Sequence, residues 1–316
     1  MNPRFLALTC TALILAPLLP GIINRTKAFF GGRDGQPLLQ LYYDLAKLLG
    51  KGAVYSRTTS WVFRAGPVVG LAAAVTALLV LPLGGAGAPV AFSGDLILLA
   101  YLLGVMRFFT VIAALDTGSA FEGMGASREV QFSMLAEPTL LLGLTALARA
   151  ASISTPSESA AAGGFLSLSG IYSGLSIDAW MHSGPALLMV GAALFVVFLA
   201  ENARIPVDDP NTHLELTMIH EAMVLDHSGP DFAMILYGAS LKLWIFGALL
   251  AGVLIPVRTG NGWLDGGATV VGVLLLAVAT GVVESVMARL RLLRAPQLLV
   301  SAGLLSTLAL ALILWS

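Results

Sequence analysis

The sequence predicts an all-α, polytopic membrane protein with about eight transmembrane helices and one amphipathic helix at the cytoplasmic surface. The mean hydropathy is +0.88, and 57% of the 316 residues are hydrophobic, which lies far outside the range of soluble proteins. Several apolar runs are also about 20 residues long, enough to cross a bilayer as a helix. We therefore expect a single integral membrane domain over residues 1–316.

The first apolar run, residues 5–23, is expected to be a retained span. It follows Arg4 but is longer than the apolar region of a signal peptide and ends without a clear small-x-small cleavage site. Seven further runs follow it. The eight expected spans lie near residues 5–23, 66–83, 96–115, 130–150, 184–203, 232–257, 267–287 and 296–315. An even number of spans places both termini on the same side.

The distribution of Lys and Arg predicts which side that is. Of the 17 basic residues, 12 fall in the loops after spans one, three, five and seven: Arg25, Lys27, Arg33, Lys47, Lys51, Arg57, Arg64, Arg128, Arg204, Arg289, Arg291 and Arg294. Only Arg4, Arg149 and Arg258 fall on the other side, and two lie inside spans. Because basic loops remain in the cytoplasm, both termini are predicted to lie outside.

An amphipathic helix is predicted within the first cytoplasmic loop. After Pro37, at a favourable first helical position, apolar side chains recur at helical spacing from Leu38 to Leu49. The polar residues of the same segment are Gln40, Asp44, Lys47 and Lys51. The segment is either a membrane-surface anchor with basic side chains near lipid headgroups or a specific docking surface, since its polar residues stack on adjacent turns.

Five ionisable side chains fall within or at the ends of the expected spans: Arg107, Glu137, Glu201, Lys242 and Glu284. A charge in the hydrocarbon costs several kcal/mol, so such groups usually face the bundle interior, pair or line a water path. Two structural pairs, Arg107 with Glu137 and Lys242 with Glu284, would satisfy four of them. The alternative is a series of carboxylates that passes protons through a buried aqueous path.

A polar stretch over residues 201–229 separates the fifth and sixth apolar runs. It holds three of the four histidines and the acids Asp208, Glu215 and Glu221, which we expect at the cytoplasmic mouth of the bundle. His213, His220 and His227 are spaced seven apart, which zinc could bridge. We nevertheless expect no metal on this chain.

Composition excludes several classes of function. The single Cys10 provides neither an internal disulfide nor a ligand set for iron–sulfur or zinc. The net charge of -1 gives no basic surface for nucleic acid. No P-loop, dinucleotide fingerprint or nucleophile elbow is present. Any redox centre is therefore expected on another chain.

Three separated motifs resemble one known family. In the first cytoplasmic loop, the segment Gln40-x-x-x-Asp44-x-x-Lys47-Leu48-x-x-Lys51 is similar to the pattern Q-x-x-x-D-x-x-K-L-x-x-K. Arg128 and Glu137, nine residues apart, resemble an Arg and a Glu that lead into the next span.

The third motif is Glu201-x-x-Arg204-x-Pro206-x-Asp208 followed by Glu215-Leu216, which resembles E-x-N-R-x-P-F-D and E-S-E-L. These patterns belong to the family of complex I subunit 1 (NuoH), which includes membrane subunits of group 4 hydrogenases. The segment Asn211-Thr212-His213 stands where NuoH subunits carry a cluster of acids. Residues 116–129 and 212–221 resemble the hydrogenase branch, of the formate hydrogenlyase and hydrogenase-4 type.

The resemblance implies a membrane-anchoring and energy-coupling subunit that is not catalytic alone and resides in a prokaryotic inner membrane. Its implied partners are a hydrogenase-like large subunit and a small iron–sulfur subunit at the cytoplasmic face, which hold the nickel–iron and iron–sulfur centres, and antiporter-like membrane subunits. The implied coupling residues are Glu137, Glu201, Asp208, Glu215, Glu221, Lys242 and Glu284. The implied docking residues are Gln40, Asp44, Lys47, Lys51, Arg128, Arg204, Asp226 and His227.

Two alternatives remain at this point. A NuoH subunit of an NADH:quinone oxidoreductase would contain a quinone site. A stand-alone secondary transporter would carry an ion or solute by itself, although no inverted repeat with interrupted helices is visible in the sequence.

Overall fold

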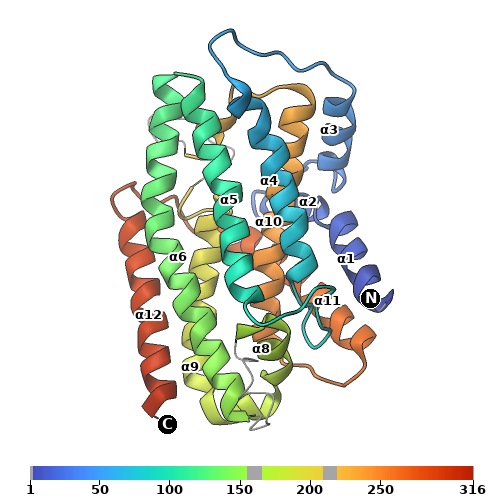
Figure 1. Ribbon diagram of the computed structural model, residues 1–316, viewed down its shortest axis with the longest axis vertical. Helices are drawn as coiled ribbons and strands as arrows, with labels where there is room; N and C mark the ends of the chain where they lie inside the picture. The colour runs from blue at the N-terminus through green and yellow to red at the C-terminus, as the bar shows by residue number, and fades with distance from the viewer. Residues whose placement is uncertain (1–2, 155–165, 209–218, 316) are drawn as a thin grey trace.

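The computed structural model describes residues 3–154, 166–208 and 219–315, and within these ranges the secondary structure is helical, with no strand. Figure 1 shows the helices running mostly along one axis. The elements are α1 (Pro3–Leu15), α2 (Leu18–Phe30), α3 (Gln40–Leu49), α4 (Trp61–Val80), α5 (Asp95–Asp116), α6 (Ala120–Ser154), α8 (Leu168–Gly174), α9 (Ile177–Glu201), η2 (Glu221–Val224), α10 (Gly229–Leu254), α11 (Gly262–Val286) and α12 (Ala295–Trp315).

The membrane-spanning character predicted from the sequence is confirmed. Seven of the described helices are long and apolar enough to cross a bilayer, and the bent pair α1 and α2 makes an eighth if it counts as one span. The length of each apolar run is set by the thickness of the hydrocarbon core. Their ends agree with those of the expected spans to within seven residues, with two exceptions.

The first exception is the first span, which was expected as one run over residues 5–23. It is divided into α1 and α2, bent by 46°. The reason is Pro17 at the break, because proline has no N–H and its ring clashes with the preceding turn. The carbonyls left free at the end of α1 accept hydrogen bonds from tyrosines: Tyr42 donates to Ile14 and Tyr237 donates to Leu13 at 2.9 Å.

The second exception is α6, which begins ten residues before the expected span at residue 130. It has 35 residues, or about 52 Å at 1.5 Å per residue, well beyond the roughly 30 Å of the hydrocarbon core. Its first turns carry Glu122, Arg128 and Glu129. A polar helical segment has no hydropathy signal, so the apolar run marked only the part of the helix that crosses the membrane.

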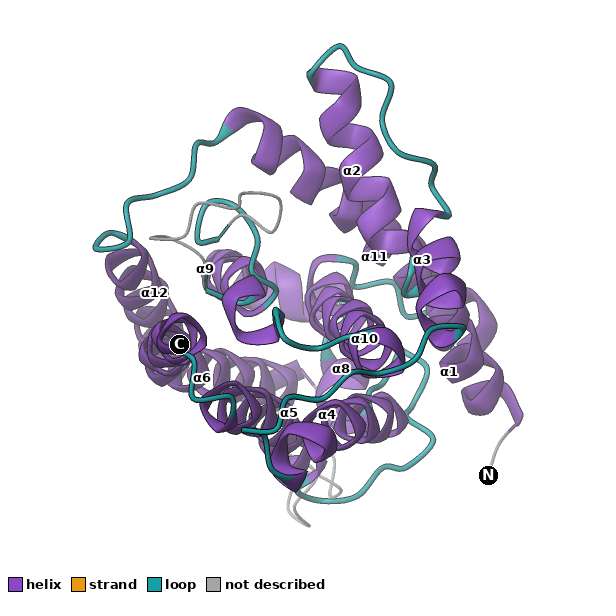
Figure 2. Cartoon of the chain, turned by 90° about the horizontal axis from the view of Figure 1, so that it is seen from above, coloured by secondary structure: helices purple, strands orange, loops and turns teal. Residues whose placement is uncertain are grey.

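Helix α10 forms the centre of the bundle. It is the most buried of the candidate spans, and Figure 2 shows it in the interior, with α4 and α11 among its neighbours. Trp244 is completely buried in the main apolar core. Lys242, two residues earlier, lies on the same buried helix. A charge is therefore placed in the interior of the bundle, and the surrounding helices must supply its partner.

The amphipathic helix predicted in the first loop is present as α3, which packs against α10 and α2. It begins at Gln40, after a turn over residues 37–39, rather than at Pro37. Tyr43 and Leu49 are exposed on it, as are Lys47 and Lys51 at and just beyond its end. Figure 1 places α3 at the end of the bundle where α5 passes into α6. Its packing on α2 and α10 places it beside the site described below.

The α2–α11 crossing depends on a glycine. A Cβ at Gly281 would lie 2.6 Å from the Cβ of Thr26 and 2.9 Å from the backbone oxygen of Ile23. The second of these atoms is main chain and cannot move aside easily. The small residue thus lets α2 approach α11 closely, as in many membrane helix pairs.

We predict that Gly281→Ala lowers the thermal stability of the purified protein in detergent, because overpacking of this kind costs about 1–3 kcal/mol. Gly267→Ala in the same helix is the matched control, since a Cβ there meets no atom within 4 Å. Alanine at position 267 should be neutral or slightly stabilising because of its higher helix propensity. Equal melting temperatures for the two variants would contradict the close crossing.

Candidate functional site

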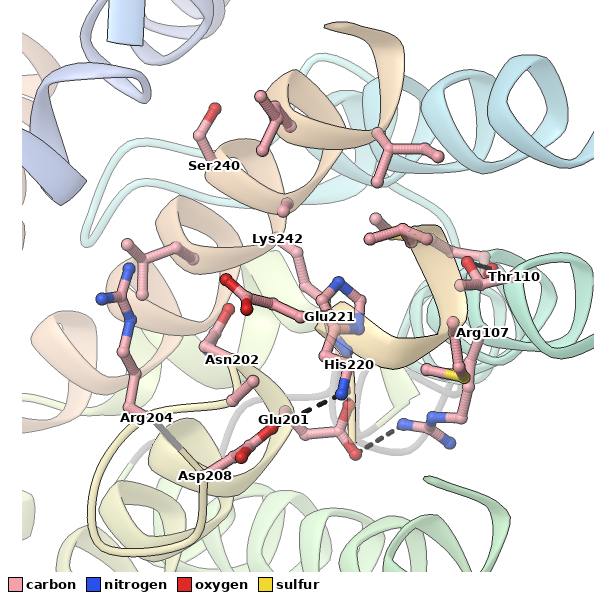
Figure 3. Close-up of a pocket in the computed structure, with 18 of the residues that line it drawn as sticks. Arg107, Thr110, Glu201, Asn202, Arg204, Asp208, His220, Glu221, Ser240 and Lys242 are labelled. Carbon is pink, nitrogen blue, oxygen red and sulfur yellow. Dashed lines mark hydrogen bonds and ion pairs between the residues drawn. The ribbon is translucent and has the colours of Figure 1, made fainter. Parts of the chain in front are cut away.

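A cavity of about 230 Å³ lies among α5, α6, η2 and α10 and the turn that follows α9. Its walls are mostly apolar, but charged groups and histidine gather on them, as Figure 3 shows. These residues are Arg107, Glu129, Glu201, Arg204, Asp208, His220, Glu221 and Lys242. Residues far apart in the sequence therefore meet around one enclosed space, which sequence reasoning had only placed at the same end of the bundle.

Arg107 of α5 is the centre of the first charged cluster. Its guanidinium forms ion pairs with Glu137, with Glu201 at 2.5 Å and with Glu129 at 3.5 Å. The side chain is 8% exposed. The expected pairing of Arg107 with Glu137 is present, but it is one of three. A planar guanidinium with five N–H donors can serve several carboxylates at once, which a lysine ammonium does less well.

Lys242 does not pair with Glu284, and that expectation is wrong. Its ammonium lies 2.8 Å from Glu201, so Glu201 is held between two cations. The pair was expected because Lys242 and Glu284 lie in consecutive spans of the sequence. The rotation of α10 instead turns Lys242 toward the end of α9. The rotation of each helix is set by packing, which hydropathy alone does not reveal.

Glu284 of α11 belongs to a second charged cluster. Its side chain is fully buried, 2.8 Å from Lys27 of α2 and 3.6 Å from Arg204. Beside it, Arg289 pairs with Asp208 at 2.6 Å. Arg204 and Asp208 lie in the turn after α9 and also line the cavity. This cluster therefore connects α2, α11 and the 201–208 turn on one side of the site.

The segment from Ile219 to Val224 closes another side of the cavity. It packs on the first turns of α6, where a Cβ at Gly125 would lie 2.8 Å from the backbone oxygen of Ile219. The backbone N–H of His220 lies 3.4 Å from a carboxylate oxygen of Asp208. Burial lowers the pKa of His220 from its ordinary value. The surroundings therefore favour the neutral form of the ring.

His227 is buried in a different environment, outside the cavity. Its ring stacks on Phe63 of α4, with centroids 3.9 Å apart and planes at 8°. Burial lowers the pKa of His227 to about 4, although Asp231 and Asp226 oppose the shift. Asp226 itself is exposed, and its backbone N–H donates to Glu122 at 3.2 Å.

The remaining predicted docking residues are spread along one end of the bundle. Gln40 donates to Asp44 at 2.9 Å within α3, while Lys47 and Lys51 are exposed and Arg128 is partly exposed. Glu215 and His213 lie outside the described residues. Glu221 lines the cavity. Among the described residues, no group of three or more His, Cys, Asp or Glu is arranged to hold a metal. The docking and coupling roles assigned from sequence remain predictions.

Sequence reasoning missed three members of the charged clusters. Glu129 lies two helical turns before Glu137, and its place on α6 would have been visible had the helix been extended past residue 130. Lys27 lies beyond the expected end of the first span at residue 23. Arg289 was counted only as a basic loop residue. Each lies just outside an apolar run, where no intramembrane charge was sought.

Removing one partner of the Lys242–Glu201 pair should be strongly destabilising. Glu201→Gln leaves the Lys242 ammonium buried without its carboxylate, a change that typically costs about 3–5 kcal/mol. We expect a large fall in melting temperature, and partial recovery when Lys242→Met is added, because the uncompensated charge is then gone. Glu129→Gln, at the longer 3.5 Å contact, serves as the milder control. If the effects of Glu201→Gln and Lys242→Met on the melting temperature were strictly additive, the pairing would be contradicted.

The stability of the protein should also depend on pH through His227. Its folded-state pKa of about 4 lies below the roughly 6.5 of an unfolded histidine. Between these values the unfolded state binds the proton more readily, so stability is full above about pH 6.5 and falls as the pH drops toward 4. His227→Phe should keep the stacking on Phe63 and flatten the melting temperature over this range. An unchanged pH profile would contradict the burial of a neutral ring.

Comparison with known sequences identifies the family of this chain. Residues 4–315 match the sequence profile described as NADH dehydrogenase. Formate hydrogenlyase subunit 4 of Escherichia coli (strain K12) is 36% identical over 290 residues, which is 89% of this chain and 89% of that protein. Hydrogenase-4 component C of the same organism is 33% identical over 251 residues, covering 79% of this chain and 74% of that protein.

A solved structure shares the fold. A chain of the membrane-bound sulfane sulfur reductase, described as an archaeal respiratory membrane complex, superposes with a TM-score of 0.78 at 19% identity, and 98% of each chain is covered. The family resemblance inferred from the three motifs is thus confirmed. The chain belongs to the NADH dehydrogenase family of membrane subunits, which includes formate hydrogenlyase subunit 4 and hydrogenase-4 component C.

Proposed function

We propose that this chain is the membrane-anchoring and energy-coupling subunit of a group 4 nickel–iron-hydrogenase-like respiratory complex, of the formate hydrogenlyase type. It is not catalytic alone, and it links redox chemistry in a peripheral module to the movement of protons or sodium ions. One observation carries the coupling role. Ion pairs continue from the cavity at one end of the bundle, through the buried Glu201 and Arg107, to the half-exposed Glu137 on α6.

The arrangement of charge supports coupling more than static anchoring. Buried ion pairs gain little stability over well-packed apolar residues, since desolvation offsets the attraction. Intramembrane ionisable groups are more often found on ion paths. Asp208, Glu221 and the turn that carries Arg204 lie at the end of the bundle that we assign to the cytoplasm. Displacement of these groups by a peripheral partner would change the field at Glu201 and Lys242, and Glu284 would respond through Arg204.

The expected partners follow from the relatives. A hydrogenase-like large subunit and a small iron–sulfur subunit would dock at the cytoplasmic end and hold the nickel–iron and iron–sulfur centres, since this chain has one cysteine. Antiporter-like subunits would lie beside it in the membrane. The docking surface would be formed by Gln40, Asp44, Lys47, Lys51, Arg128 and Asp226. Arg204 and His227, which were also expected to dock a partner, are largely buried and would support that surface from behind. The location would be a prokaryotic inner membrane, with both termini outside.

One observation favours the alternative of a quinone-reducing subunit. The cavity extends to Pro20 of α2 and Leu41 of α3, and the mostly apolar walls around charged groups suit a ring with polar substituents. Inhibition of the purified complex by a short-chain quinone analogue, competitive with added quinone, would favour this alternative. Insensitivity to the analogue would favour the hydrogenase-like assignment.

The deciding experiment is to purify the complex from its native membrane through a tag on this chain. We expect a nickel-containing large subunit, an iron–sulfur subunit and antiporter-like chains in the preparation, identified by mass spectrometry and metal analysis. Reconstituted vesicles should couple hydrogen turnover to a transmembrane ion gradient. Recovery of the chain alone, with solute uptake by the isolated chain, would overturn the proposal.

Charge reversal on the proposed docking surface should release the peripheral module. We expect Lys47→Glu combined with Lys51→Glu to reduce co-purification of the large subunit several-fold, because both side chains are exposed and rim charges mainly steer association. Arg149→Glu is the matched control, since Arg149 is also exposed but lies near the other end of α6. The loss of co-purification should be larger at lower ionic strength, because salt then screens the charges less. Equal losses in both variants would argue against docking at α3.

A further inference from the structure

A second cavity of about 270 Å³ lies beside the first, between α5 and α6, and reaches α9 and α10. Its walls are largely apolar and include Ile97, Gly104, Leu140 and Phe246. Among the residues that line the two cavities, Arg107 and Glu201 are the members common to both. The ion pair between these two residues, at 2.5 Å, is therefore the partition that separates one space from the other.

The second cavity, called here the lateral cavity, reaches the side of the bundle. Tyr101 on its wall is 72% exposed, and the side chain of Glu137 is 51% exposed. Both lie on helices that span the membrane. A half-exposed carboxylate at this depth is costly in lipid. Arg107 offsets part of this cost through its ion pair with Glu137, so one guanidinium serves both the partition and the lateral opening.

The charge of the first cluster is not balanced. Two cations, Arg107 and Lys242, face three carboxylates, Glu129, Glu137 and Glu201. With all five groups ionised the sum is -1. Buried groups of one excess sign are expensive unless a counter-charge is taken up. Glu201 lies beside both cations, whereas Glu129 and Glu137 each pair with Arg107.

We propose that Arg107 is a gate for proton transfer between the two cavities: in its observed position it blocks passage, and movement away from Glu201, with the ion pair to Glu137 kept, joins the cavities. The proposal rests on the coupling role proposed above and deepens it by naming the blocking group. A fixed positive charge in a narrow passage repels protons and cations, as an arginine does in other selective pores. A proton that moves directly from one cavity to the other passes the guanidinium, because Arg107 lines both.

The gate also explains why residue 107 is an arginine. A guanidinium that leaves Glu201 keeps Glu137 and Glu129 as partners, so its movement breaks one of three ion pairs and never leaves the charge unpaired. Gly104 lies directly beside Glu137: a Cβ there would meet the nearest Glu137 oxygen at 3.8 Å, an ordinary van der Waals contact, so any larger side chain would enter the space that the movement needs. Without turnover the passage between the two cavities is therefore closed. It opens only after a change at Glu201 or at its neighbour Lys242.

The test measures passive proton leak in vesicles that contain the purified complex, without turnover, after a pH step followed by a trapped dye. We expect Arg107→Gln to collapse the gradient roughly tenfold faster than wild type or more, as a lowered barrier to transfer requires. Arg107→Lys, which keeps the positive charge, should remain tight. An assembled Arg107→Gln complex that is as tight as wild type would overturn the gate.

A second variant decides the question if Arg107→Gln does not assemble. Gly104→Val would fill the lateral cavity next to Glu137 without altering any charge. We expect ion translocation per hydrogen turned over to fall several-fold while hydrogen turnover itself continues. Val105→Leu, at the neighbouring exposed position of α5, is the matched control and should behave as wild type. Unchanged translocation in Gly104→Val would overturn the proposal.

The two proposals fail in different ways. If wild-type vesicles turn over hydrogen without building any gradient, the coupling function is wrong, whereas the leak measurement still reports on the partition. If wild type builds a gradient but removal of the Arg107 charge causes no leak and Gly104→Val has no effect, the gate is wrong and the coupling function stands.

Discussion

The burial of Arg107 constrains the rest of this structure. A guanidinium inside an apolar bundle must meet carboxylates, and α5 alone offers none near it, so α6 and α9 have to approach with Glu129, Glu137 and Glu201. Lys242 then adds α10 to the same cluster. Each of these four spans is thereby held in one orientation about its own axis. In lipid this matters more than in water, because apolar helix faces gain nothing by choosing each other over acyl chains.

The second charged cluster holds the helices on the other side of the cavity in place. Lys27, Arg204 and Glu284 join the broken first span to α11 and to the turn after α9. The α2–α11 crossing at Gly281 keeps Lys27 within reach. The cavity is therefore bounded by two ionic clusters on different sets of helices. A partner that shifts the 201–208 turn acts on both clusters, since Glu201 is the first residue of that segment and Asp208 the last.

Hydropathy predicted the spans well because bilayer thickness fixes how long an apolar run must be. It failed where the physical cause leaves no apolar signal. Pro17 interrupts a run that is apolar on both sides, and the polar first turns of α6 look like a loop. Ion-pair partners were the hardest part to predict. Lys242 had Glu201 and Glu284 as comparable partners in sequence, and only the rotation of α10 decides between them. Lys27 was excluded because the predicted span ended too early.

The two clusters lie on either side of one cavity, so a change of charge in one acts on the other. One cluster consists of Arg107, Lys242, Glu129, Glu137 and Glu201, and the other contains Lys27, Arg204, Arg289, Asp208 and Glu284. At an effective dielectric of about 20, unit charges several ångströms apart interact by a few kcal/mol. Neutralising Asp208 or Glu284 would make one side of the cavity more positive. That change would stabilise the carboxylates of the cluster around Arg107, so the two clusters are coupled through the electric field across the cavity.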